Sequence, residues 1–158
     1  MIYPIVKYGQ PVLEQVGDII TEFDTPELTK LVEDMFESMY AAKGVGLAAP
    51  QIGIGKKIAV IDISCGEDAA QKLVLINPEI IEGKGTNIDV EGCLSIPEFY
   101  ADVERPARIK VGYLDRTGAR QELEADGLLA TCLQHEIDHL NGVLFIDHIS
   151  RLKRERVI

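Results

Sequence analysis

Residues 134–139 read QHEIDH, an HExxH motif, and this stretch decides how the fold of the chain is interpreted. On a helix, residues four apart lie on one face, so His135 and His139 can direct two imidazoles at one metal ion. Glu136 is close enough to hold a metal-bound water without being a ligand itself. Two of the three histidines of the chain lie in this motif. The stretch therefore predicts a helix that carries a metal site.

The flanking residues predict where this helix begins and ends. Asp126-Gly127 provides an N-cap and a first turn, and Asn141-Gly142 provides a C-cap signal. The alternative is a pair of core histidines satisfied by hydrogen bonds, but burying two imidazoles and a carboxylate together without a metal would be costly. At about 100° per residue, the apolar, inward face of the helix consists of Leu128, Cys132, His135 and His139.

A catalytic metal also needs a third protein ligand and an open position for water. The metzincin pattern places a third histidine six residues after the second, where this chain has Phe145. A thermolysin-like enzyme needs a glutamate well downstream, and the chain ends at residue 158. Asp147 and His148 are candidates on distance alone.

A stronger candidate lies upstream, in the segment EGCLSIPE at residues 91–98. Cys93 follows a glycine and precedes a turn that ends in proline, a setting that could hold a thiolate at a fixed angle. Taken alone, this cysteine is more simply interpreted as a small buried hydrophobic residue.

A third segment, GVGLAAPQIG at residues 44–53, has too many glycines for a helix and too much apolar character for a solvated loop. Its small residues would let the backbone approach a ligand closely, and Gln51 adds an amide donor. An ordinary tight turn is the alternative. The segment has neither a Walker ending nor GxGxxG spacing.

Together, GVGLAAPQIG, EGCLSIPE and QHEIDHLNG resemble the three sequence motifs of the peptide deformylase family, in the same order and approximate spacing. The resemblance extends over nearly the whole chain. It implies a metal-dependent hydrolase that removes the formyl group from the N-terminal methionine of newly made polypeptides, releasing formate. It implies Cys93, His135 and His139 as metal ligands. It also implies Glu136 as the catalytic acid/base that assists attack by a metal-bound hydroxide.

The resemblance further implies how substrate and ion are held. Gln51 and the backbone amide of Leu94 would form the oxyanion site, and the backbone of Gly46 would hydrogen-bond the substrate. One divalent ion is implied, with iron(II) as the physiological ion; zinc or nickel could replace it during purification, because affinity generally rises along that series.

A pocket for methionine should be apolar and lie beside the metal. Leu128 and Cys132 precede His135 on the same helix face, and Val45 is a further candidate. Simple helix packing is an equally good interpretation of Leu128 and Cys132 from the sequence, and the resemblance favours the pocket. Many family members have an arginine near the end of the second motif, where this chain reads Phe99-Tyr100. The arginine that would anchor the substrate backbone beyond methionine is therefore not among the residues that match the family.

The remaining patterns predict an α+β fold for a single domain over residues 1–158, with mostly antiparallel sheets around the central HExxH helix. Thr25-Pro26-Glu27 begins an N-terminal helix whose apolar stripe continues toward Gly44. We expect strands at 57–63, 73–76, 109–114 and 119–124, and a short helical tail at the C-terminus.

Composition narrows the setting. The net charge of −10 argues against nucleic-acid binding, although residues 151–158 form a basic tail of the kind that docks some relatives on the ribosome. No apolar run approaches the roughly 18 residues of a membrane span, and the N-terminus lacks signal-peptide architecture. The odd number of cysteines, three, favours a reducing cytoplasm, or an organelle if a transit peptide has been removed.

Two other functions remain in competition. A general metallopeptidase would share HExxH but has no reason to carry the other two segments. A non-catalytic binding module is disfavoured because every ligand, the base and both oxyanion positions are present.

Overall fold

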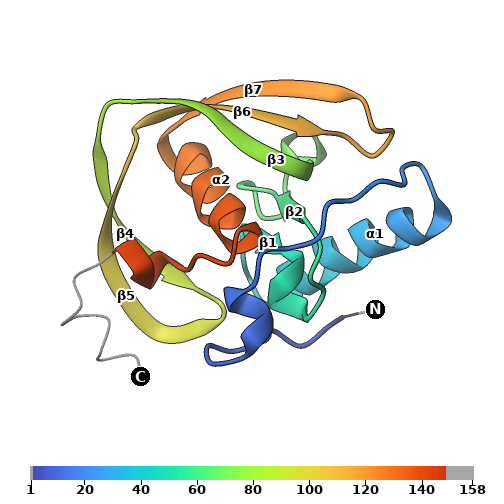
Figure 1. The fold of residues 1–158 in the computed structure, drawn as a ribbon. Helices are drawn as coiled ribbons and strands as arrows, with labels where there is room; N and C mark the ends of the chain where they lie inside the picture. The colour runs from blue at the N-terminus through green and yellow to red at the C-terminus, as the bar shows by residue number, and fades with distance from the viewer. Residues whose placement is uncertain (1, 149–158) are drawn as a thin grey trace.

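The larger of two sheets in the computed structural model, which describes residues 2–148, is a five-stranded antiparallel sheet (Figure 1). Every neighbouring pair of its strands is antiparallel. In spatial order the strands are β1 (Gly46–Ala48), β2 (Ile58–Ile61), β3 (Leu73–Lys84), β6 (Arg108–Leu114) and β7 (Arg120–Asp126).

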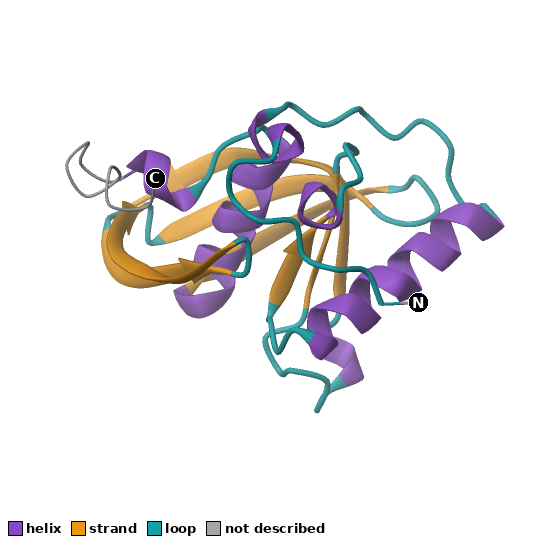
Figure 2. Cartoon of the chain, turned by 90° about the horizontal axis from the view of Figure 1, so that it is seen from below, coloured by secondary structure: helices purple, strands orange, loops and turns teal. Residues whose placement is uncertain are grey.

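Two helices cover opposite faces of this sheet. In β2, Val60 packs in the cluster around α1 (Pro26–Ala41), whereas the next residue, Ile61, packs in the cluster around α2 (Gly127–Leu140). Successive side chains of a strand point to opposite faces, so the sheet lies between the helices (Figure 2). The α1 stripe in contact with the sheet includes Leu28, Val32, Met35, Phe36 and Met39. The corresponding α2 residues are Ala130, Leu133 and Ile137.

A separate two-stranded sheet consists of β4 (Asn87–Cys93) and β5 (Ile96–Arg105). It curves around the side of α2 in Figure 1. A register shift between Gly92 and Cys93 ends the regular pairing at the turn. A third core cluster packs under this hairpin and contains Leu13, Ile96, Val103, Leu144, Phe145 and Ile146.

Short 3-10 helices connect the larger elements. They are η1 (Pro11–Glu14), η2 (Ala49–Ile52), η3 (Ala69–Gln71) and η4 (Phe145–His148). Among the described residues, no helix is both long and apolar enough to cross a membrane.

The predicted α+β fold with antiparallel sheets is confirmed, and so are both long helices. Thr25 caps α1 by accepting a 3.1 Å hydrogen bond from the Leu28 amide. Cys93 was expected to precede a turn, and Leu94 and Ser95 form that turn, which is the tip of the β4–β5 hairpin. The glycine-rich segment forms β1 and η2. The expected C-terminal helical tail lies outside the described residues.

Candidate metal centre and active site

Three side chains converge at the centre of the molecule: Cys93 from the end of β4, and His135 and His139 from α2. The His139 Nε2 atom lies 3.2 Å from His135 Nε2 and 3.3 Å from Cys93 Sγ. Tetrahedral zinc, with bonds of about 2.0–2.1 Å to nitrogen and about 2.3 Å to sulfur, separates its ligand atoms by roughly 3.3–3.6 Å. The spacing and the donor set therefore fit a divalent metal ion.

The two histidines differ in how their rings are oriented. His135 Nδ1 lies 3.1 Å from Glu91 Oε1 and donates to it, which directs Nε2 at the cluster, where a bound metal would take the place of the Nε2 proton. Burial lowers the pKa of His135, but hydrogen bonds with Cys93 and Glu91 outweigh it and raise the pKa to about 10. His139 is fully buried, and burial holds its pKa well below the usual value. Its Nδ1 has no hydrogen-bond partner among the described residues.

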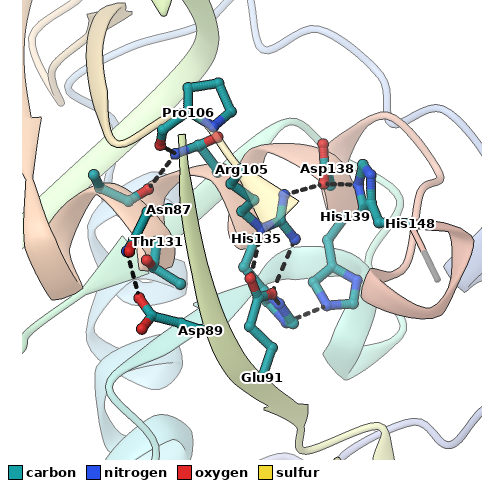
Figure 3. A network of polar contacts seen from close by, with 12 residues as sticks. Asn87, Asp89, Glu91, Arg105, Pro106, Thr131, His135, Asp138, His139 and His148 are labelled. Carbon is teal, nitrogen blue, oxygen red and sulfur yellow. Dashed lines mark hydrogen bonds and ion pairs between the residues drawn. The ribbon is translucent and has the colours of Figure 1, made fainter. Parts of the chain in front are cut away.

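Behind Glu91 lies a buried arginine that the sequence did not single out (Figure 3). Arg105 contacts both Glu91 oxygens, at 2.6 and 2.9 Å, and also contacts Asp138 at 2.8 Å. Burial raises the pKa of Glu91, but its hydrogen bonds with His135 and Arg105 prevail and lower it. Glu91 is therefore a charged acceptor behind His135.

Glu136 is a buried carboxylate that lines the same cavity as Cys93 and His135, with only 3% of the residue exposed. Burial raises its pKa to about 7, against the opposing charge of His135. A Cβ atom added to Gly46 would lie 2.9 Å from Glu136 Oε2, so only glycine lets the β1 backbone pass this close. A carboxyl group with a pKa near neutrality can both accept and return a proton.

Gln51 and Leu94 lie beside Cys93 and line the same cavity. The Gln51 side chain is buried; its Oε1 accepts from the Ala48 amide at 3.0 Å, which orients Nε2 toward Cys93 Sγ, 3.5 Å away. Leu94 follows Cys93 in the hairpin turn, and its carbonyl accepts from Lys7 Nζ at 3.3 Å. The side-chain nitrogen of Gln51 therefore faces the Cys93 thiol.

A cavity of about 620 Å³ opens beside the cluster. Val45, Leu128 and Cys132 line it, as do all the other site residues expected from the sequence except His139. Leu128 was expected on the inward face of the helix, but it is 57% exposed because it lies in the first turn of α2, at the cavity rim. Tyr100 is 68% exposed and also lines the cavity, with its ring packed closely over Gly92.

The alternative third ligands do not reach the cluster. His148 Nε2 lies 2.8 Å from Asp138 Oδ2, and Asp147 accepts from the Leu144 amide. Phe145, at the position where a metzincin has its third histidine, packs its ring against His135 with 6.1 Å between centroids.

An HExxH helix joined by a thiol from a neighbouring strand defines a metalloenzyme site. The family model described as polypeptide deformylase matches residues 2–155. The peptide deformylase of Mesorhizobium japonicum is 54% identical over 99% of this chain and 89% of its own length. That of Agrobacterium fabrum is also 54% identical, over 99% of this chain and 92% of its own length.

Solved structures agree with the sequence relatives. The peptide deformylase of Legionella pneumophila superimposes with a TM-score of 0.94 at 44% identity, covering 99% of this chain and 91% of that one. The peptide deformylase of Synechococcus elongatus superimposes with a TM-score of 0.92 at 46% identity, covering 98% of this chain and 85% of that one. The chain belongs to the peptide deformylase family. It is an enzyme of that class, and the Cys93, His135 and His139 group is its potential metal site.

Proposed function

We propose that this enzyme hydrolyses the formyl group from the N-terminal formyl-methionine of nascent polypeptides, at the centre formed by Cys93, His135 and His139. The observation that carries the proposal is a buried carboxyl, Glu136, beside three convergent ligand atoms at one end of a cavity. A divalent ion held by these atoms would supply a Lewis acid that lowers the pKa of water toward 7.

Glu136 acts as the general base and then as the general acid. Its carboxylate takes a proton from the attacking water, and the water oxygen forms a bond to the formyl carbon. The carbon–nitrogen bond then breaks, and Glu136 returns the proton to the departing amine. The products are formate and a free N-terminus. The raised pKa of Glu136 suits both transfers.

Negative charge develops on the former formyl oxygen during this reaction, and two donors are available for it. Gln51 Nε2 is held near Cys93 through its bond to Ala48, and the Leu94 amide follows the same cysteine. Loss of one such donor typically costs about 2.7–4 kcal/mol of transition-state stabilisation.

The methionine side chain would occupy the part of the cavity lined by Val45, Leu128 and Cys132. β1 is an edge strand of the sheet, and Val45 directs its carbonyl toward the Asp62 amide near β2. Backbone groups of successive strand residues alternate between the two edges, so those of Gly46 face away from β2. They are available to a substrate backbone.

Iron(II) is the proposed ion, since one thiolate beside two imidazoles makes a site soft enough for iron as well as zinc. Metal-stripped protein would be reconstituted with iron(II), nickel or zinc, and activity followed under air and under argon. The iron form should lose activity in air faster than the others, as iron and Cys93 oxidise. Equal air stability of the iron and nickel forms would contradict this choice of ion.

The substrate assignment is tested with three methionyl peptides that carry a formyl group, an acetyl group or a free amine. Only the formyl peptide should be hydrolysed, with formate released in equal amount. Cleavage of an internal peptide bond would instead indicate a general metallopeptidase. The expected cytoplasmic location and the ribosome contact through residues 151–158, outside the described part of the chain, stay predictions.

A further inference from the structure

We propose that Arg105 is a positioning residue that holds the metal centre by clamping Glu91 behind His135, with Asp138 and His148 bracing the guanidinium from its other side. The inference rests on the proposed function, since it concerns how that same centre is held. Arg105 lies at the end of β5, outside the three sequence motifs, and lines neither the cluster of ligand atoms nor the cavity.

The inner contacts fix one particular oxygen. Arg105 Nη2 donates to Glu91 Oε1 at 2.9 Å, while Nε donates to Oε2 at 2.6 Å. Oε1 is also the atom that lies 3.1 Å from His135 Nδ1. Because the planar fork holds both carboxylate oxygens, the acceptor for His135 cannot rotate away. The Arg105 and Glu91 side chains are only 6% and 5% exposed, so water cannot easily take over these bonds.

The outer contacts join the clamp to the helix that bears both histidines. Arg105 Nη1 donates to Asp138 Oδ2 at 2.8 Å, and the same oxygen lies 2.8 Å from His148 Nε2 (Figure 3). Asp138 lies in α2 and His148 ends η4. The guanidinium therefore connects the hairpin, the metal-binding helix and the last described segment of the chain.

The clamp acts on one ligand and not on the other. His135 has Glu91 behind it, whereas His139 Nδ1 has no hydrogen-bond partner among the described residues. A disturbance at Arg105 should therefore change the orientation of a single imidazole. We expect weaker metal binding and altered metal geometry, with substrate binding unaffected.

Arg105→Lys is the principal variant because lysine keeps the charge but lacks the planar fork. Zinc affinity, measured by competition with a chromophoric chelator, should fall about 10–100-fold, as is typical when the partner of a ligating histidine is lost. The absorption spectrum of the cobalt(II) form should shift, because it reports ligand geometry. KM for formyl-methionyl peptide should be unchanged at saturating metal. Arg108→Lys is the matched control, since Arg108 is an exposed arginine with only a 3.6 Å ion pair, and it should alter none of these.

Glu91→Gln and Asp138→Asn make the test independent of whether the first variant folds. Glu91→Gln should weaken zinc binding at least as much as Arg105→Lys, and Asp138→Asn should weaken it less. Combining Arg105→Lys with Glu91→Gln should cost little beyond Glu91→Gln alone, because the two changes break the same connection.

Parental zinc affinity in Arg105→Lys, or losses that simply add in the double variant, would overturn the inference while leaving the proposed function intact. A parent protein that binds no divalent metal would overturn both. The Arg105→Lys protein could also fail to fold. If it does, and folded Glu91→Gln protein binds zinc with the parental affinity, Arg105 serves stability alone and the inference is overturned.

Discussion

The inner wall of the cavity and its outer rim are built in opposite ways. On the inner wall, Glu91, Gln51 and Glu136 are buried, and Glu91 and Gln51 are hydrogen-bonded to neighbouring side chains. On the rim, Val90, Tyr100 and Leu128 are apolar and between 57% and 68% exposed. The wall is suited to chemistry that needs fixed atoms, whereas the rim can receive different side chains.

This difference also predicts how the two regions respond to substitution. Buried polar groups are costly unless they are paired, so changes on the inner wall should be large and non-additive. Exposed apolar residues contribute separately and modestly. The following experiments probe the contrast, beginning with the largest expected effect.

Cys93→Ala should remove a metal ligand and reduce deformylation to background. The measurement is metal content after dialysis together with formate release. Cys65→Ala is the matched control, because Cys65 is exposed and lies outside the cluster. If the Cys93→Ala protein keeps both its metal and its activity, Cys93 is not a metal ligand.

Glu136→Gln should keep the metal, because the side chain is not among the ligand atoms, but lower kcat by about 10²–10⁴-fold. Metal analysis and steady-state kinetics on the same preparation separate the two effects. Turnover near the parent rate would mean that another group moves the proton.

Acid should inhibit the enzyme through this same carboxyl. Burial raises the pKa of Glu136 to about 7, and a divalent cation nearby favours the ionised form, which brings the pKa back down. Because the base must be ionised, kcat/KM should fall about tenfold per pH unit on the acidic side of the profile, with an apparent pKa below 7. A pH–rate profile of metal-loaded enzyme checks this, and an apparent pKa above 7 for the acidic limb would contradict it.

Gly46→Ala tests the close approach of β1 to Glu136. The added methyl would lie 2.9 Å from the carboxylate oxygen and displace it, so we expect a loss of about 10–100-fold in kcat with the fold retained. Gly55→Ala is the control, because an added Cβ there meets nothing within 4 Å. Equal kinetics for the two variants would show that Glu136 tolerates the shift.

Tyr100→Ala should have the smallest effect, and one that depends on the substrate. An aromatic contact is worth about 0.5–1.5 kcal/mol, so kcat/KM should fall a few-fold for peptides with an aromatic residue after methionine. Peptides with serine there should be unaffected. Ile88→Ala, an exposed apolar residue of β4 outside the cavity, is the control. A uniform loss for all peptides would contradict a role in selecting substrates.

The sequence predicts those parts of the site that depend on local spacing. Helix α2 and its two histidines follow from period and capping, although the Asp126 side chain makes no capping hydrogen bond. Arg105 could not be found in this way, because it lies 14 positions from Glu91 and 33 from Asp138, and only the tertiary packing of the β4–β5 hairpin against α2 brings the three together.

The β4–β5 hairpin was also not predicted from the sequence. Residues 88–91 of β4 alternate apolar and polar side chains, but the run is only four residues long, and its apolar members, Ile88 and Val90, are both exposed, so it does not mark a buried strand face. The exposure of Leu128 was likewise unpredictable, since periodicity gives a direction around the helix but not how far the neighbouring sheet extends.

The attachment of the β4–β5 hairpin to α2 has a consequence for folding. A two-stranded sheet is marginally stable by itself, and here Cys93 and Arg105 link it to the helix from opposite ends of the pair. An ion bound to Cys93 and both histidines would act as a cross-link between two chain segments far apart in sequence. Each tenfold excess of free metal over its Kd then adds about 1.4 kcal/mol to the free energy of unfolding, and chelation should lower the Tm by loosening the hairpin first.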